Sequence, residues 1–139
     1  LYPRLLEALA EHDGIGLVVG REGEQVAIAG QTGALWVGPQ GERVEGQNPM
    51  ASLADPQWAL EQVVRVTRFP HAGDLILLGA WDDEQVITFE DQVATHGGLG
   101  GPQVWPFLAF SARERLSARG IENSEEIYTR LVRAYGTYD

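Results

Sequence analysis

The apolar positions in the first third of the chain change from a helical to an alternating pattern. An amphipathic helix that ends at Gly14 is predicted because apolar residues recur there at spacings of three and four: Leu5, Leu6, Leu9 and Ala10. Short β-type runs with turn sequences between them follow at residues 15–19, 25–29 and 34–37, and Val44 belongs to a further strand-like step. This order predicts a small antiparallel meander, with a loop over residues 46–53.

The second half of the chain mixes helical and strand signals. Asp55-Pro56 is a typical helix start, and the buried face of that helix should carry Leu60, Val63, Val64 and Thr67. Residues 74–80 are almost continuously apolar, which predicts a buried strand, and residues 85–89 should return the chain after a turn. Two short helices should close the chain, with Asn123 and Glu126 forming a capping box at the last one.

These elements predict the α+β fold class: a small antiparallel meander plus buried late strands flanked by helices. Residues 1–139 are expected to form a single domain. The chain starts at Leu1 and its only methionine is Met50, so we interpret it as the C-terminal piece of a longer protein. No signal-peptide pattern and no apolar run near ~20 residues occurs, which predicts a soluble piece whose parent is cytoplasmic or membrane-associated.

Composition narrows the chemistry. The absence of cysteine excludes disulfides, thiolate catalysis and cysteine-ligated zinc. A formal charge of −10 argues against a broad nucleic-acid surface, because such surfaces need clustered cations. No basic residues interleave with the tryptophans, so core or edge packing is expected for Trp36, Trp58, Trp81 and Trp105.

The most unusual stretch is Thr95-His96-Gly97-Gly98-Leu99-Gly100-Gly101-Pro102-Gln103. Four glycines in five residues give up side-chain packing, so the loop needs positive φ angles or a close approach that a Cβ would block. A histidine at its head could reach a metal or a phosphate, whereas the alternative is a surface turn with a solvated histidine.

Residues 90–103, from Glu90-Asp91 to Gln103, followed by Pro106-Phe107-Leu108, resemble the C-terminal segment of bacterial proteins similar to type I phosphodiesterases/nucleotide pyrophosphatases. These proteins belong to the alkaline phosphatase superfamily. The resemblance continues more weakly upstream, in Tyr2-Pro3, Gly14-Ile15-Gly16 and Phe69-Pro70-His71. It implies that this chain is cut from a larger three-layer α/β/α phosphohydrolase-like fold.

The resemblance also implies two-metal hydrolysis of a phosphodiester or pyrophosphate small molecule by the parent, with zinc as the expected metal. The family's last metal-ligand histidine lies in a Thr/Ser-His-Gly context, which corresponds to His96 after Thr95 and before Gly97. The family's nucleophile and its Asp-His-Gly ligand pair are not in this chain, where His12 precedes Asp13-Gly14 in reverse order. No catalytic residue is therefore assigned here, and the piece alone is expected to be inactive.

The loop residues near this site are Thr95, Gly97, Gly98, Gly100 and Gly101, and Glu90 or Asp91 could orient the imidazole. His71 and His12 are expected to be structural. Asp82, Asp83 and Glu84 form an acidic run that is more typical of a solvated hairpin than of a cation site.

Two further alternatives follow. The chain could be a non-catalytic accessory or interaction domain with a structural glycine loop, or the family match could hold with catalysis lost. If the piece was cut from a larger sheet, its exposed strand edges favour a homo-oligomer.

Overall fold

The computed structural model describes residues 3–82, 84–91, 97–104, 106–111 and 116–136. The chain divides into two compact units, Leu1–Trp105 and Pro106–Asp139, which are described separately below. The expectation that residues 1–139 form one domain of a longer protein stays a prediction. Within the described ranges, every helix is too short or too polar to span a lipid bilayer.

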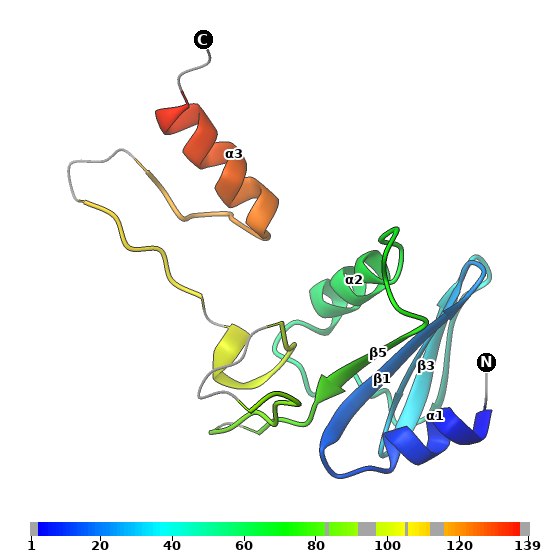
Figure 1. Cartoon of the computed structure of the whole chain (residues 1–139). Helices are drawn as coiled ribbons and strands as arrows, with labels where there is room; N and C mark the ends of the chain where they lie inside the picture. The colour runs from blue at the N-terminus through cyan, green and yellow to red at the C-terminus, as the bar shows by residue number, and fades with distance from the viewer. Residues whose placement is uncertain (1–2, 83, 92–96, 105, 112–115, 137–139) are drawn as a thin grey trace. The chain divides into compact units, whose positions relative to one another are not determined.

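The first unit is built on a five-stranded antiparallel sheet with strand order β4-β3-β2-β1-β5 (Figure 1). Its elements in chain order are α1 (Pro3–Ala10), β1 (Ile15–Glu22), β2 (Gln25–Gly30), β3 (Gly33–Gly38), β4 (Gly41–Gly46), α2 (Pro56–Val66), β5 (Leu75–Gly79) and the 3₁₀ turn η1 (Gly101–Val104). Each strand from β1 to β4 is joined to the next by a two-residue turn. The pairs that close these three turns are Glu22 with Gln25, Gly30 with Gly33 and Gly38 with Gly41. The α+β class and the predicted meander are confirmed.

Alternating side chains place the main core on one face of the sheet. Val19 pairs with Ile28, and Ile28 with Leu35, so large apolar side chains lie in a row across the three strands. Helix α2 covers this row with Ala59, Leu60 and Val63, and Met50 and Leu53 of the preceding loop close the cluster. The predicted apolar face of α2 is thus the one that is buried, together with Thr67 just after the helix.

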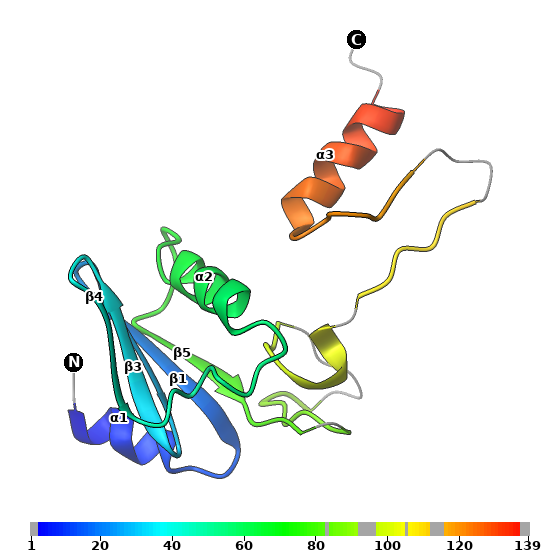
Figure 2. The same ribbon diagram turned by 180° about the vertical axis from the view of Figure 1, so that it is seen from behind.

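Helix α1 packs on the opposite face of the sheet, as the two views show (Figures 1 and 2). A smaller cluster forms there from Ala10, Ile15 and Val18, with Leu6 and Leu9 packed against it. Because Val18 and Val19 point to opposite faces and are both 0 % exposed, β1 is buried on its two sides. The predicted helix from Leu5 to Ala10 is confirmed.

The start of α2 follows from its first two residues. Oδ1 of Asp55 accepts a hydrogen bond from the backbone N–H of Trp58 at 3.0 Å, which satisfies one free amide of the first turn. Pro56 takes the first helical position, where no N–H is needed. The sequence signal Asp-Pro therefore acts as predicted.

The late strands differ from expectation. The sequence predicts a buried strand over residues 74–80, but β5 lies at the edge of the sheet, where β1 is its one neighbour among the described strands, and its Leu77 is 38 % exposed. Residues 85–89 form no strand and make a single bridge between Trp81 and Val86. An apolar run predicts burial on two faces, yet at an edge of an antiparallel sheet one side of the strand has no neighbour.

The second unit contains α3 (Ser124–Tyr135), on which no residue is fully buried. Oδ1 of Asn123 accepts from the N–H of Glu126 at 3.1 Å, which confirms the predicted cap. In a capping box the Glu126 carboxylate would accept from the N–H of the cap residue Asn123. Here its Oε2 accepts instead from the N–H of the preceding residue, Glu122, at 3.0 Å. Two closing helices are predicted from the sequence; among the described residues of this unit α3 is the one helix, and residues 112–115 lie outside them.

The cap at Asp55 yields a stability prediction. Asp55→Ala should lower the free energy of unfolding by about 1 kcal/mol, because the Trp58 amide loses its partner in the structure. Asp55→Asn is the matched control, since an asparagine side-chain oxygen caps equally well. Urea unfolding followed by tryptophan fluorescence measures both, and an equal loss in the two variants would contradict the capping role.

Candidate functional site

The described part of the glycine loop is held by one glutamine side chain. Oε1 of Gln103 accepts from the N–H of Gly98 at 3.3 Å, and its Nε2 donates to the carbonyl oxygen of Gly100 at 3.2 Å. Gly97 and Gly101 have φ angles of +84° and +67°, in the left-handed region that favours glycine. The positive φ angles predicted for this loop are therefore present at two of its glycines.

Trp81 connects the glycine loop to the main core. Its indole is packed against the core cluster, and a Cβ on Gly100 would overlap the pyrrole side of the ring. A Cβ on Gly16 of β1 would come within 2.7 Å of the six-membered ring. At Gly16 and Gly100 the indole thus occupies the space that a larger side chain would need. Leu99 of the same loop also packs on the core.

A pocket of about 200 Å³ lies beside this loop. It is bounded by β5 at Leu77–Gly79, by residues 86–90, and by Gly97, Gly98 and Gln103. Its polar groups are the hydroxyl of Thr88, the carboxylate of Glu90 and the amide of Gln103. The Thr88 hydroxyl also accepts a hydrogen bond from the N–H of Glu90 at 3.2 Å, which holds the chain in a turn there.

The structure describes some of the residues predicted for the metal site and not others. His96 and Thr95 lie outside the described residues, so their placement stays a prediction. Glu90 and Asp91 are both exposed, and of the two Glu90 is among the residues that line the pocket. Within the described part of the chain, no three carboxylate or imidazole groups gather where they could hold a metal ion.

The acidic run at residues 82–84 contains a turn-forming aspartate. Oδ1 of Asp82 accepts hydrogen bonds from the N–H groups of Glu84 and Gln85, each at 2.8 Å. These two bonds stabilise the ionised carboxylate and lower the pKa of Asp82 below its ordinary value. Asp82 shapes the reversal between β5 and Val86, and Asp83 lies outside the described residues.

Neither of the other two histidines is among the residues that line the glycine-loop pocket. Nδ1 of His12 accepts from the N–H of Gly14 at 3.0 Å, so this ring shapes the turn between α1 and β1. His71 lines a shallow apolar depression with Val66, Phe69 and Ile76 beyond the end of α2. Both positions fit the structural role that the sequence favours, and no described contact joins them to the loop.

Trp81 and Gln103 are the loop-holding residues that sequence reasoning missed. Trp81 is predicted only as a packing residue, and Gln103 only as the last letter of the glycine-rich stretch. A usable signal exists in the glycines themselves, because Gly16 and Gly100 are small for the same indole although 84 positions separate them in the chain. One sequence shows that both are glycine and does not show that they share a neighbour.

The contact between Gly100 and Trp81 yields a second stability prediction. Gly100→Ala should lower the free energy of unfolding by about 1–3 kcal/mol, because the added methyl displaces the indole. Gly38→Ala is the matched control, since a Cβ there meets Gln25 no closer than 3.6 Å and should be tolerated. Urea unfolding and tryptophan emission test the pair, and equal stability of the two variants would show that the loop does not rest on Trp81.

Comparison of the chain with known proteins finds no matching protein-family model, no matching curated protein and no matching solved structure.

Proposed function

We propose that the chain is the C-terminal portion of a metal-dependent phosphohydrolase similar to phosphodiesterases/nucleotide pyrophosphatases, and that it contributes His96 as a metal ligand. The proposal rests on the resemblance of residues 90–103 to the family segment. The observation that supports it is the fixed base of the glycine loop. Gln103 and Trp81 hold the chain at Gly98 and Gly100, directly after the proposed ligand in the sequence.

A fixed base matters for a metal ligand because binding then orders fewer residues. The amide of Gly98, which lies two positions after His96 in the sequence, is bonded to Gln103, so coordination would have fewer of the following residues to order. The pocket beside Gly97 also offers a carboxylate at Glu90, the type of group that accepts the second N–H of a ligating imidazole. The proposed site thus combines a donor of the right type, His96, with a hydrogen-bonded segment that follows it in the sequence.

The described residues fit only part of such a site. Zinc takes about four donors, and the described side chains offer no cluster of three. The remaining ligands and the nucleophile of the proposed enzyme would come from residues outside this chain. When bound, the metals would stabilise charge on the reacting oxygens, and the role of this chain is to hold one imidazole in place.

The second candidate function is a non-catalytic accessory domain with a structural glycine loop. It is favoured by the packing of Gly100 against the Trp81 indole, which needs no ligand to explain it. It is also favoured by the core of the first unit, which α2 closes on one face of the sheet. In that case substitution of His96 would leave any activity of the longer protein unchanged.

The chain alone is expected to be inactive. Residues 1–139 mixed with an aryl phosphodiester and with zinc or manganese should show no turnover above background, because the nucleophile and most ligands are missing. A colorimetric assay of aryl alcohol release measures this. Turnover that disappears in His96→Ala would contradict the proposal that the site is incomplete.

In the longer protein, His96→Ala should lower kcat/KM by about 100-fold or more, because one metal donor is lost. His71→Ala and His12→Ala are the matched controls and should change thermal stability more than turnover. Metal content per chain is measured in parallel for the three variants. Full metal content with a near-normal rate in His96→Ala would favour the accessory-domain alternative.

A further inference from the structure

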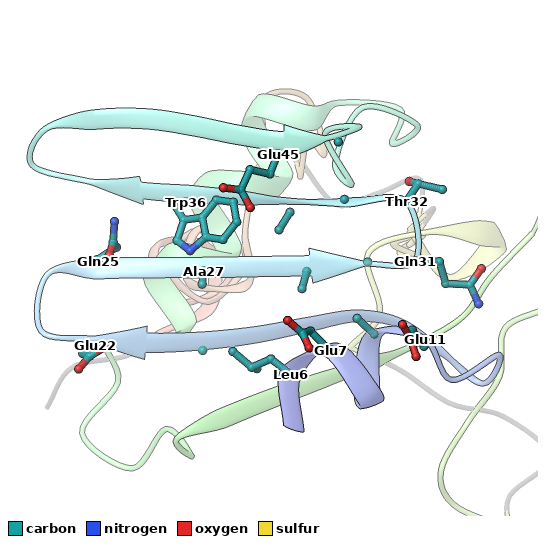
Figure 3. Close-up of a pocket in the computed structure, with 17 residues that line it drawn as sticks. Leu6, Glu7, Glu11, Glu22, Gln25, Ala27, Gln31, Thr32, Trp36 and Glu45 are labelled. Atoms are coloured by element: carbon teal, nitrogen blue, oxygen red, sulfur yellow. The ribbon is translucent and has the colours of Figure 1, made fainter. Parts of the chain in front are cut away.

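A groove of about 710 Å³ lies on the sheet face that carries α1 (Figure 3). Its floor is made by small side chains of two neighbouring strands, Ala27 and Ala29 of β2 and Ala34 of β3. Helix α1 forms one wall through Leu6 and Ala10. Trp36 stands on the other side, so the groove runs beside α1 and over the middle of the sheet.

The composition of the floor is unusual for a solvated sheet face. Antiparallel sheets that face water on one side alternate apolar and polar residues along each strand. On β2 the inner residues Val26 and Ile28 are buried, but the outer residues Ala27 and Ala29 are also apolar and half-buried. Short side chains on such a face allow another backbone to approach closely.

Helix α1 is too small to cover this face. It has eight residues, which is about 12 Å of helix, and it contacts β1 and β2. A helix about 10 Å wide covers roughly two strands at their ordinary spacing of about 4.8 Å. Beyond the two strands that α1 contacts, the same face of β3 and β4 therefore leaves the width of a second helix lying beside α1.

The rim of the groove is acidic. Figure 3 shows Glu7 on α1, Glu11 just after this helix and Glu45 on the opposite side, and Glu22 lies at the end of β1. None of the described residues that line the groove is basic. The nearby Arg43 lies 4.1 Å from the centroid of the Trp36 ring and donates from its NH1 group to Oε1 of Glu45 at 2.8 Å.

We propose that this groove binds a basic amphipathic α-helix of a separate protein. The small apolar side of that helix would rest on Ala27, Ala29 and Ala34, with lysine or arginine side chains facing Glu7 and Glu11. Trp36 and Arg43 at the edge are of the residue types that contribute most to protein interfaces. A second copy of this chain is a poor occupant, because each copy carries a charge of −10.

The test uses a synthetic helical peptide with alanine on one face and lysine along its flanks, titrated into residues 1–139. Binding is followed by tryptophan fluorescence and by backbone amide NMR shifts. We expect saturable binding that weakens with salt and shifts amides of β2 and β3. A peptide of the same sequence with glutamate in place of lysine should not bind.

Two charge-reversed variants localise the binding. Glu7→Lys/Glu11→Lys should weaken it about tenfold, because two attractive contacts become repulsive. Glu42→Lys/Glu61→Lys is the matched control: it changes net charge equally, and both residues line a different groove beside α2. Ala27→Gln, which fills the groove without charge, should weaken binding while the thermal unfolding midpoint stays unchanged.

Three outcomes would overturn the proposal. The first is the absence of saturable binding. The second is equal weakening in both double variants, which would mean attraction to net charge alone. The third is equal binding of the acidic peptide, which would remove charge complementarity as the basis of recognition.

Discussion

The burial of β1 on both faces is the constraint on which the first unit depends. Val18 and Val19 are neighbours in the sequence, point in opposite directions and are both fully covered. A strand of this kind needs a strand on each side and a cover on each face, and β2, β5, α2 and α1 supply these. The edge strands β4 and β5 each have a neighbouring strand on one side only among the described strands, so their other side is not paired within the sheet.

The glycine loop illustrates how packing and candidate chemistry can use the same residues. The loop is tied to the core through Trp81 and is closed by Gln103, so Gly100 has a steric reason, and Gly97 and Gly101 a conformational one, that exist without any ligand. These ties are made by residues that follow His96 in the sequence, and the proposed ligand role concerns His96 itself. The packing role of the loop glycines is therefore compatible with a ligand role for His96, and an experiment on His96 distinguishes a metal site from a purely structural loop.

Much of the fold could be predicted because local signals matched the tertiary structure. The helical spacing at Leu5 and Leu9, the Asp-Pro start at Asp55 and the cap at Asn123 each depend on residues close together in the chain. The position of β5 at an edge could not be predicted, since apolar composition reports burial and not the number of neighbouring strands. The groove beside α1 was missed for a similar reason, because alternating alanines on β2 read as ordinary strand residues until the opposite face is known.

The order of contacts in the sheet has a consequence for its dynamics. Strands β1 to β4 meet through two-residue turns, so their pairing closes very short loops. Strand β5 instead pairs with β1 from the far side of the meander and α2, for example Val19 with Ile76, and that pairing closes a long loop at a higher entropic cost. Trp81 and the glycine loop follow β5 directly. We therefore expect slow hydrogen exchange in β1 and β2 and faster exchange in β5, which places the candidate site in the part of the sheet that opens first.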